Sequence, residues 1–106
     1  MAYQTFTQLI KAGGNANGNY PSNAGVDYPG PAGFLSMAGT FAGASFSVQT
    51  LPDGMTTWID MASSTLTSAG SVLIRLGMGE KFRLVETGAA AGTVVDAVYA
   101  PYTGGV

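Results

Sequence analysis

The clearest pattern in the chain is an alternation of apolar and polar side chains with a period of two residues, which is typical of half-buried β-strands. In residues 44–49, Phe46 and Val48 lie on one face of such a strand, and Ser and Gln residues lie on the other. Residues 72–76 and 81–84 show the same alternation. We expect the inward faces of these strands, and of one further strand, to form the core. The predicted core residues are Phe46, Val48, Trp58, Ile74, Phe82 and Leu84.

A Pro-Asp-Gly turn at residues 52–54 separates the strand at 44–49 from an expected return strand over residues 57–61. Trp58 lies in the middle of that return strand, next to Ile59. We therefore expect its indole ring in the core and not on a platform that stacks against a sugar. Together the two strands predict an antiparallel hairpin.

The last predicted strand runs from Thr93 to Tyr99 and is apolar on both faces except at Asp96. We expect both faces of this strand to be buried, one of them under a second sheet or a neighbouring subunit. A buried carboxylate needs a partner. A salt bridge from Asp96 to Arg75 or Arg83 is the simplest one, and a role at a subunit interface is the alternative.

Residues 13–33 differ sharply in composition from the rest of the chain. They contain all four Asn residues, three of the five Pro residues and a cluster of Gly residues, which is the chemistry of turns and loops. A loop of about 20 residues within a compact domain is uncommon and is usually functional. We therefore expect an extended arm that contacts a partner. Together with Asp96, the candidate contact residues are Asn15, Asn17, Tyr20 and Tyr28.

These elements predict an all-β fold, a two-sheet antiparallel β-sandwich that is jelly-roll-like and carries an extended N-terminal loop or arm. Beyond Lys11, no stretch combines apolar residues at helical spacing with capping residues, so we expect almost no helix. A length of 106 residues suits one domain. Within that domain we assign residues 1–33 to an N-terminal strand and arm, and residues 34–106 to the β-sandwich.

The composition argues against an enzyme. The chain has no His and no Cys, which removes the commonest general base, thiolate metal sites and disulfides. Its two lysines, Lys11 and Lys81, lie beside Gly-rich turns, where a solvated charge is expected. The carboxylates, among them Asp53 and Glu86, are scattered and are expected to be solvated or to cap turns. We therefore predict no catalytic residue, no metal site and no cofactor.

The chain carries few charged residues, and this affects which classes of partner we expect. Charged residues make up 9% of the sequence, against roughly 25% in an average globular domain. The net charge of −2 leaves no basic field for a nucleic acid. No apolar run is long enough for a membrane span, and the first residues do not resemble a secretory signal. A surface of small uncharged residues favours a protein that is partly buried against other subunits.

Several short motifs resemble those of small structural proteins from the virions of tailed bacteriophages. They are Gly-Thr-Phe-Ala-Gly-Ala at residues 39–44, Pro-Asp-Gly at 52–54, Trp-Ile-Asp at 58–60 and Glu-Lys-Phe-Arg-Leu at 80–84. The resemblance covers residues 39–87. It implies a capsid decoration protein, also called a cement protein, which would bind the outside of the head shell and bridge capsid subunits.

The same resemblance implies a jelly roll that forms a homotrimer, whose main partner is the major capsid protein of the head. The chain would be made in the host cytoplasm and located on the capsid surface of the virion. Two alternatives remain open. One is a tail or fibre module that binds a host surface glycan through Tyr20, Tyr28 and Trp58, and the other is a structural protein of the tail or neck.

Overall fold

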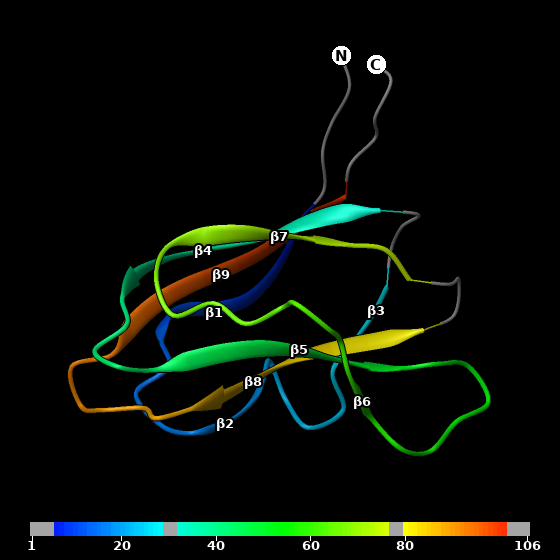
Figure 1. Cartoon of the computed structure of the whole chain (residues 1–106), viewed down its shortest axis with the longest axis horizontal. Helices are drawn as coiled ribbons and strands as arrows, with labels where there is room; N and C mark the ends of the chain where they lie inside the picture. Colours follow the sequence, from blue (N-terminus) through cyan, green and yellow to red (C-terminus); the bar gives the residue numbers. More distant parts are fainter. Residues whose placement is uncertain (1–5, 29–31, 77–79, 102–106) are drawn as a thin grey trace, which may run out of the picture.

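The computed structural model describes residues 6–28, 32–76 and 80–101. Within these residues the chain forms nine strands and no helix, which confirms the predicted all-β sandwich (Figure 1). The strands are β1 (Thr7–Gly13), β2 (Gly18–Tyr20), β3 (Val26–Asp27), β4 (Gly33–Thr40), β5 (Ser45–Leu51), β6 (Ile59–Asp60), β7 (Gly70–Ile74), β8 (Lys81–Thr87) and β9 (Val94–Pro101).

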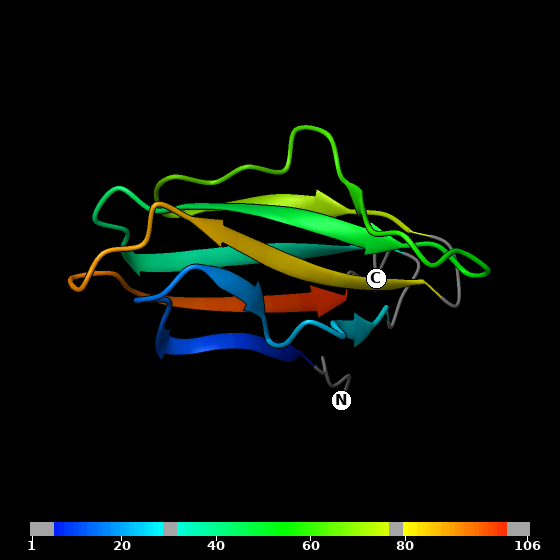
Figure 2. The same ribbon diagram turned by 90° about the horizontal axis from the view of Figure 1, so that it is seen from below.

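The strands form two antiparallel sheets. The four-stranded sheet has the order β1-β9-β4-β7, which can be followed from the bottom of Figure 2 upward. The five-stranded sheet has the order β2-β8-β5-β6, and β3 also pairs with β8. The pairing is nested along the chain, because β1 pairs with β9, β2 and β3 with β8, β4 with β7, and β5 with β6.

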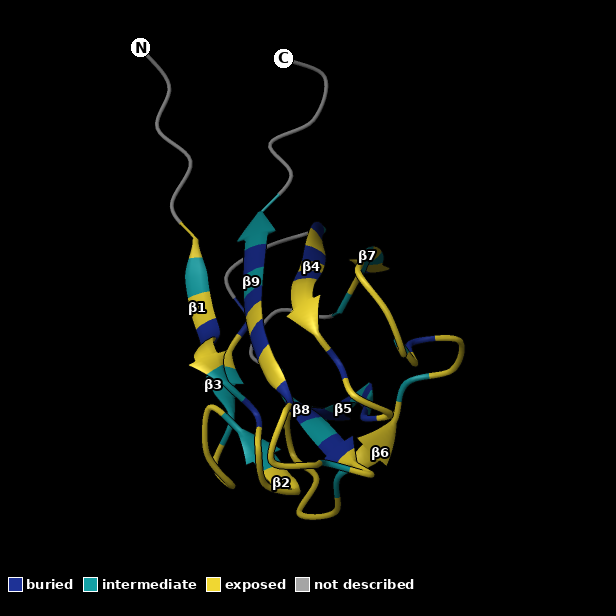
Figure 3. Cartoon of the chain, turned by 90° about the vertical axis from the view of Figure 1, so that its left-hand side faces the viewer, coloured by how far each residue is buried: buried dark blue, intermediate teal, exposed yellow. Residues whose placement is uncertain are grey.

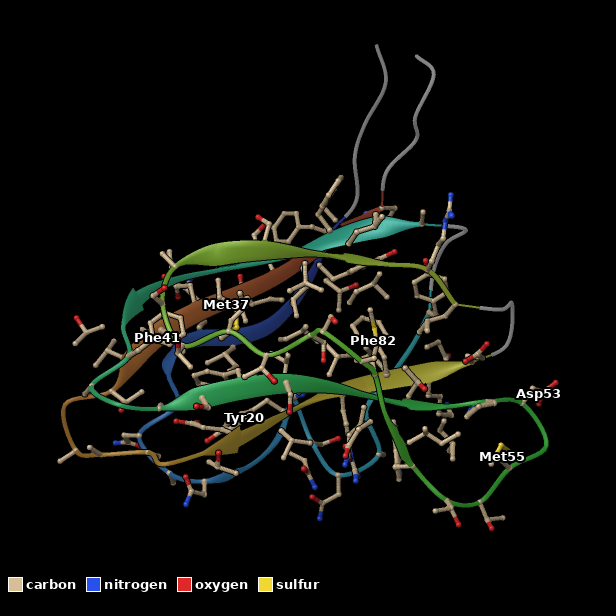
Figure 4. The ribbon with its side chains drawn as sticks, in the orientation of Figure 1. Tyr20, Met37, Phe41, Asp53, Met55 and Phe82 are labelled. Atoms are coloured by element: carbon tan, nitrogen blue, oxygen red, sulfur yellow. The ribbon has the colours of Figure 1, made fainter. Side chains whose placement is uncertain are left out.

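The core lies between the two sheets and follows the alternation in the sequence. Figure 3 shows buried and exposed residues alternating along β4 and β9, and Figure 4 shows Met37, Phe41 and Phe82 between the sheets. Five of the predicted core residues are fully buried, namely Phe46, Val48, Ile74, Phe82 and Leu84.

Trp58 is the sixth predicted core residue, and the structure places it outside the core. The return strand is only β6, where Asp60 pairs with Gln49 and both side chains face away from the core. Side chains two residues apart share a face of a strand, so Trp58 also lies on the outer side. The guanidinium of Arg83 lies 4.1 Å from the centre of its ring.

Within this chain only one face of the last strand is buried, and the five-stranded sheet covers it, while the other face is open to a neighbouring subunit. β9 is a central strand, and its burial alternates, so that Val95, Ala97 and Tyr99 face the core while Val94 is exposed. Asp96 lies on the exposed face and forms no salt bridge within the described residues. Its Oδ1 instead accepts a hydrogen bond of 2.7 Å from the backbone N–H of Ala12, where β1 is irregular.

The described part of the Gly-, Asn- and Pro-rich segment packs on the sandwich and does not extend from it as an arm. It forms β2 and β3, which both pair with β8. Tyr28 is 6% exposed, and its hydroxyl donates a hydrogen bond of 3.0 Å to the backbone oxygen of Ile74. Its ring contacts those of Phe82 and Tyr99. Tyr28 is therefore part of the core, and its predicted role as a contact residue is wrong.

Candidate interaction surface

The outer face of the four-stranded sheet carries a row of apolar side chains. Phe34 on β4 pairs with Leu73 on β7 and with Ala100 on β9. Phe6 directly precedes β1, whose Thr7 pairs with Tyr99, the neighbour of Ala100. The exposed fractions are 62% for Phe6, 44% for Phe34 and 47% for Leu73. We call Phe6, Phe34, Leu73 and Ala100 the apolar row.

Uncharged polar side chains lie beside the apolar row on the same strands. Ser36 and Ser71 also pair across β4 and β7, two residues away from Phe34 and Leu73, and their hydroxyls lie 2.8 Å apart and form a hydrogen bond. On β1, the amide of Gln8 donates to the backbone oxygens of Ile10 and Ala97. These polar groups already have partners within the chain, so covering them leaves few donors or acceptors unsatisfied.

The outer face of the five-stranded sheet is different, because a polar network covers it. Arg83 donates to Oε1 of Gln49 from both Nε and Nη2, at 3.0 and 2.8 Å, and from Nη1 to the backbone oxygen of Asn23 at 2.6 Å. The amide of Gln49 donates to Asp60 at 2.9 Å. Partial burial lowers the pKa of the Arg83 guanidinium. The guanidinium nevertheless keeps its positive charge at neutral pH.

Charged side chains occur on both sheets. Besides Arg83 and Asp60, the five-stranded sheet carries Lys81 and Asp27, whose side chains form a salt bridge of 2.7 Å on the surface.

On the four-stranded sheet, Lys11 on β1 and Asp96 on β9 are exposed, and the exposed Arg75 directly follows β7. What distinguishes this sheet is the apolar row. Its outer face is therefore better suited to contact with another protein surface than the face that the network of Arg83 covers.

The residues predicted for partner contacts are not brought together in one place. Asn15 and Asn17 are exposed on the connection from β1 to β2, and the side-chain oxygen of Asn17 accepts a hydrogen bond of 2.8 Å from the N–H of Ala89. Tyr20 is half-buried, and its hydroxyl donates to the backbone oxygen of Ala16. Asp96 lies on the other sheet.

The aromatic residues considered for a glycan platform are also separated. Tyr28 is in the core, Tyr20 packs against the core from β2, and the guanidinium of Arg83 covers one face of Trp58. Gly25 also leaves room for the indole, because a Cβ at Gly25 would lie 2.7 Å from Cη2 of Trp58. The indole is therefore partly covered by its own chain.

Sequence reasoning missed two features of the surface and the core. The apolar row was missed because Phe34 belongs to a mostly apolar run, in which the sequence does not show which residues face outward, and because the strand pairing that places Phe34 beside Leu73 cannot be read from the sequence. Glu86 was expected to be solvated, but it is 1% exposed, and burial raises the pKa of its carboxyl group. Its inward position follows the alternation of Phe82 and Leu84 along β8.

Comparisons with known proteins add no relative. No protein-family model, no curated protein and no solved structure matches the chain. The described residues contain no group of three or more acidic side chains that could hold a metal ion. A helix that could cross a membrane is likewise not found in this part of the chain.

Proposed function

We propose that this chain is a non-enzymatic structural protein of a tailed-phage virion, a capsid decoration protein that docks with the outer face of its four-stranded sheet. The observation that carries the proposal is the apolar row, exposed on the outer face of one sheet while the hydrogen-bonded network of Arg83 covers the outer face of the other. The nested strand pairing supports the jelly roll that the motif resemblance implies. The partner would be the major capsid protein.

The size of the apolar row is consistent with adhesion that depends on several copies. With about 200 Å² for a fully exposed large side chain, the exposed fractions of Phe6, Phe34 and Leu73 leave about 300 Å² of apolar surface. Covering it stabilises a complex by about 7 kcal/mol, which is similar to the cost of association, about 4–15 kcal/mol. A single copy would bind weakly, and a homotrimer would bind firmly through three linked contacts.

The proposal is tested first by locating the chain. Mass spectrometry of particles purified from the phage that encodes it should detect the chain, and immunogold electron microscopy should place it on the head. Label on the tail or neck would support the alternative structural role and overturn decoration of the capsid. Absence from the particles would overturn both.

A binding experiment tests the surface. Recombinant chain is mixed with purified heads that lack it, and the pelleted fraction is measured. Phe34→Ser and Leu73→Ser each remove about 90 Å² of exposed apolar surface, so each should weaken binding by about 2 kcal/mol, or roughly 30-fold. Ile59→Ser is the matched control, because Ile59 is also an exposed large apolar residue but lies on β6 of the other sheet. Equal effects of all three changes would refute docking through the four-stranded sheet.

The expected trimer has its own measurement, which is size-exclusion chromatography with light scattering. A monomer at high concentration would contradict it.

The glycan-binding alternative has less support, because Tyr28 is buried and Arg83 lies over Trp58. Binding of the wild-type chain on a glycan array, lost in Trp58→Ala, would favour that alternative.

A further inference from the structure

Glu86 is a buried carboxyl group without a countercharge. It lies on β8 and faces inward, and among the described residues it is the one charged side chain that is buried. Both of its carboxyl oxygens are inaccessible to water, and among the described residues no donor lies in hydrogen-bonding geometry to either of them, since the hydroxyl of the nearby Tyr20 donates to the backbone oxygen of Ala16 instead. An ionised carboxylate in such a place is strongly destabilising, so the group favours its neutral form.

Four elements meet around this carboxyl group, namely the connection after β1, β2, β5 and β9. A Cβ on Gly14, in the connection, would lie 3.2 Å from Oε1 of Glu86, 3.1 Å from Val95 on β9 and 3.4 Å from Phe46 on β5. On β2, Gly18 pairs with Glu86. The backbone at Gly14 therefore lies directly over the carboxyl group, and its φ of +91° favours glycine at this position.

The groups that face Glu86 supply no positive charge. Gly14, Phe46 and Val95 cannot ionise, and Asp96, which follows Val95, points to the outer face of its sheet. From β2 the titratable neighbour is Tyr20, whose hydroxyl donates to Ala16. Burial, and after it the nearby Glu86, raise the pKa of Tyr20. Burial also raises the pKa of Glu86, and the Tyr20 hydroxyl opposes this effect.

The cover over Glu86 includes a short strand at the edge of the five-stranded sheet. β2 has three residues and lies at the edge of the sheet. The connection before it, residues 14–17, is attached to the rest of the chain by the hydrogen bond between Asn17 and Ala89. Short edge segments with few buried contacts open at the lowest free-energy cost.

We propose that Glu86 and this cover form a pH-responsive element, in which residues 14–20 are closed over the neutral carboxyl group and open when it ionises. Opening admits water to the carboxylate and removes the cost of keeping the charge buried. The neutral form is fully present below the ordinary pKa of a glutamic acid. The closed state therefore loses stability as the pH rises from there through the raised pKa of the folded protein. This element is independent of the proposed function.

Hydrogen–deuterium exchange of the full chain tests the proposal. Exchange is measured between about pH 4 and pH 9, a range that covers the ordinary glutamic acid pKa and upward shifts of several units. Each rate is corrected for the intrinsic effect of pH. In the wild-type chain, the protection of amides 15–20 should fall at least about tenfold across this range, while the amides of β5 keep theirs.

Two variants make the result specific. In Glu86→Gln the segment should stay protected at every pH, because the side chain cannot ionise. Asp53→Asn changes an exposed carboxylate on the loop between β5 and β6 (Figure 4), and it should behave as the wild type. Protection that does not change with pH in the wild type, or that falls equally in Glu86→Gln, would overturn the proposal.

A direct titration keeps the question decidable if Glu86→Gln does not fold. The carboxyl carbon of Glu86 is followed by nuclear magnetic resonance in the wild-type chain. A titration midpoint above that of an ordinary glutamic acid, with amide shifts of residues 15–20 following the same curve, supports the proposal. An ordinary midpoint, or amide shifts that do not follow the carboxyl group, overturns it.

Discussion

Gly33 lies at the start of β4 directly against the ring of Tyr99, and its replacement by alanine gives a sharp test of how the core is packed. A Cβ at Gly33 would lie 2.3 Å from the hydroxyl oxygen of Tyr99, 2.4 Å from its Cζ and 2.6 Å from the backbone oxygen of Ala100. Ordinary contacts of a Cβ begin at 3.4 Å, so the tyrosine ring must move by about 1 Å.

The ring of Tyr99 has little room for such a movement. Tyr99 is fully buried, and its ring centre lies 5.2 Å from that of Phe82 and 5.6 Å from that of Tyr28. Overpacking of this kind costs about 1–3 kcal/mol, and the contact with backbone at Ala100 places Gly33→Ala near the upper end. Because the unfolded chain of an alanine variant has less entropy to lose, about 0.4–1 kcal/mol is recovered. We expect a net loss of about 2–3 kcal/mol.

The assay is thermal and urea unfolding followed by circular dichroism. At about 4 °C per kcal/mol, the expected loss lowers Tm by about 8–12 °C. Gly92→Ala is the matched control, because the nearest atom to its Cβ would be 3.9 Å away, at Ala42. That variant should match or slightly exceed the wild type in stability. Adding Tyr99→Leu to Gly33→Ala should cost at least about 1 kcal/mol less than the sum of the single changes.

The reasoning is refuted if Gly33→Ala is as stable as Gly92→Ala. It is also refuted if the two changes at Gly33 and Tyr99 are additive, since the cost would then not come from their contact. Either result would mean that the region around Tyr99 accepts an added methyl group without repacking.

Three further predictions concern polar groups. Ser64→Ala removes a buried hydroxyl that accepts a hydrogen bond from one backbone N–H and donates to a backbone oxygen; it should cost about 1–3 kcal/mol in urea unfolding, and an unchanged midpoint would contradict this role. Arg83→Lys keeps the charge but loses the paired hydrogen bonds and the stacking on Trp58. It should lower the free energy of unfolding by about 1–2 kcal/mol. Lys81→Gln, which removes only an exposed salt bridge, should lower it by less than about 0.5 kcal/mol. The free energy of unfolding should fall as the pH rises from the ordinary glutamic acid pKa through the raised pKa of Glu86; a slope that is the same in Glu86→Gln would show that other groups cause it.

The strands with strict alternation were predictable because local order decides which side chains share a face. Apolar residues stand at alternate positions on β5 and β8, and the four predicted to face inward are buried as expected, namely Phe46, Val48, Phe82 and Leu84. The face of Trp58 was not predictable in this way. The loop that precedes β6 sets its register, and the register places Asp60 beside Gln49, so that Trp58 faces outward.

The segment before residue 34 shows how distant pairing overrides local composition. Its Gly, Asn and Pro residues have low strand propensity, so the sequence indicated an arm. Yet Gly18 to Tyr20 pair with β8, and Tyr28 inserts its ring between residues of both sheets. Strand pairing and burial outweigh propensities that differ by about 1 kcal/mol or less per residue.

The all-β class, most of the core residues and the low charge could be predicted from the amino-acid sequence, because they depend on composition and on neighbours along the chain. The folded arrangement was needed to show that Phe6, Phe34 and Leu73 form one row and that Glu86 lies beneath Gly14. The apolar row brings together residues from strands that are far apart in the chain, and the cover over Glu86 connects the two sheets. Both therefore depend on strand order and register, which local patterns do not contain.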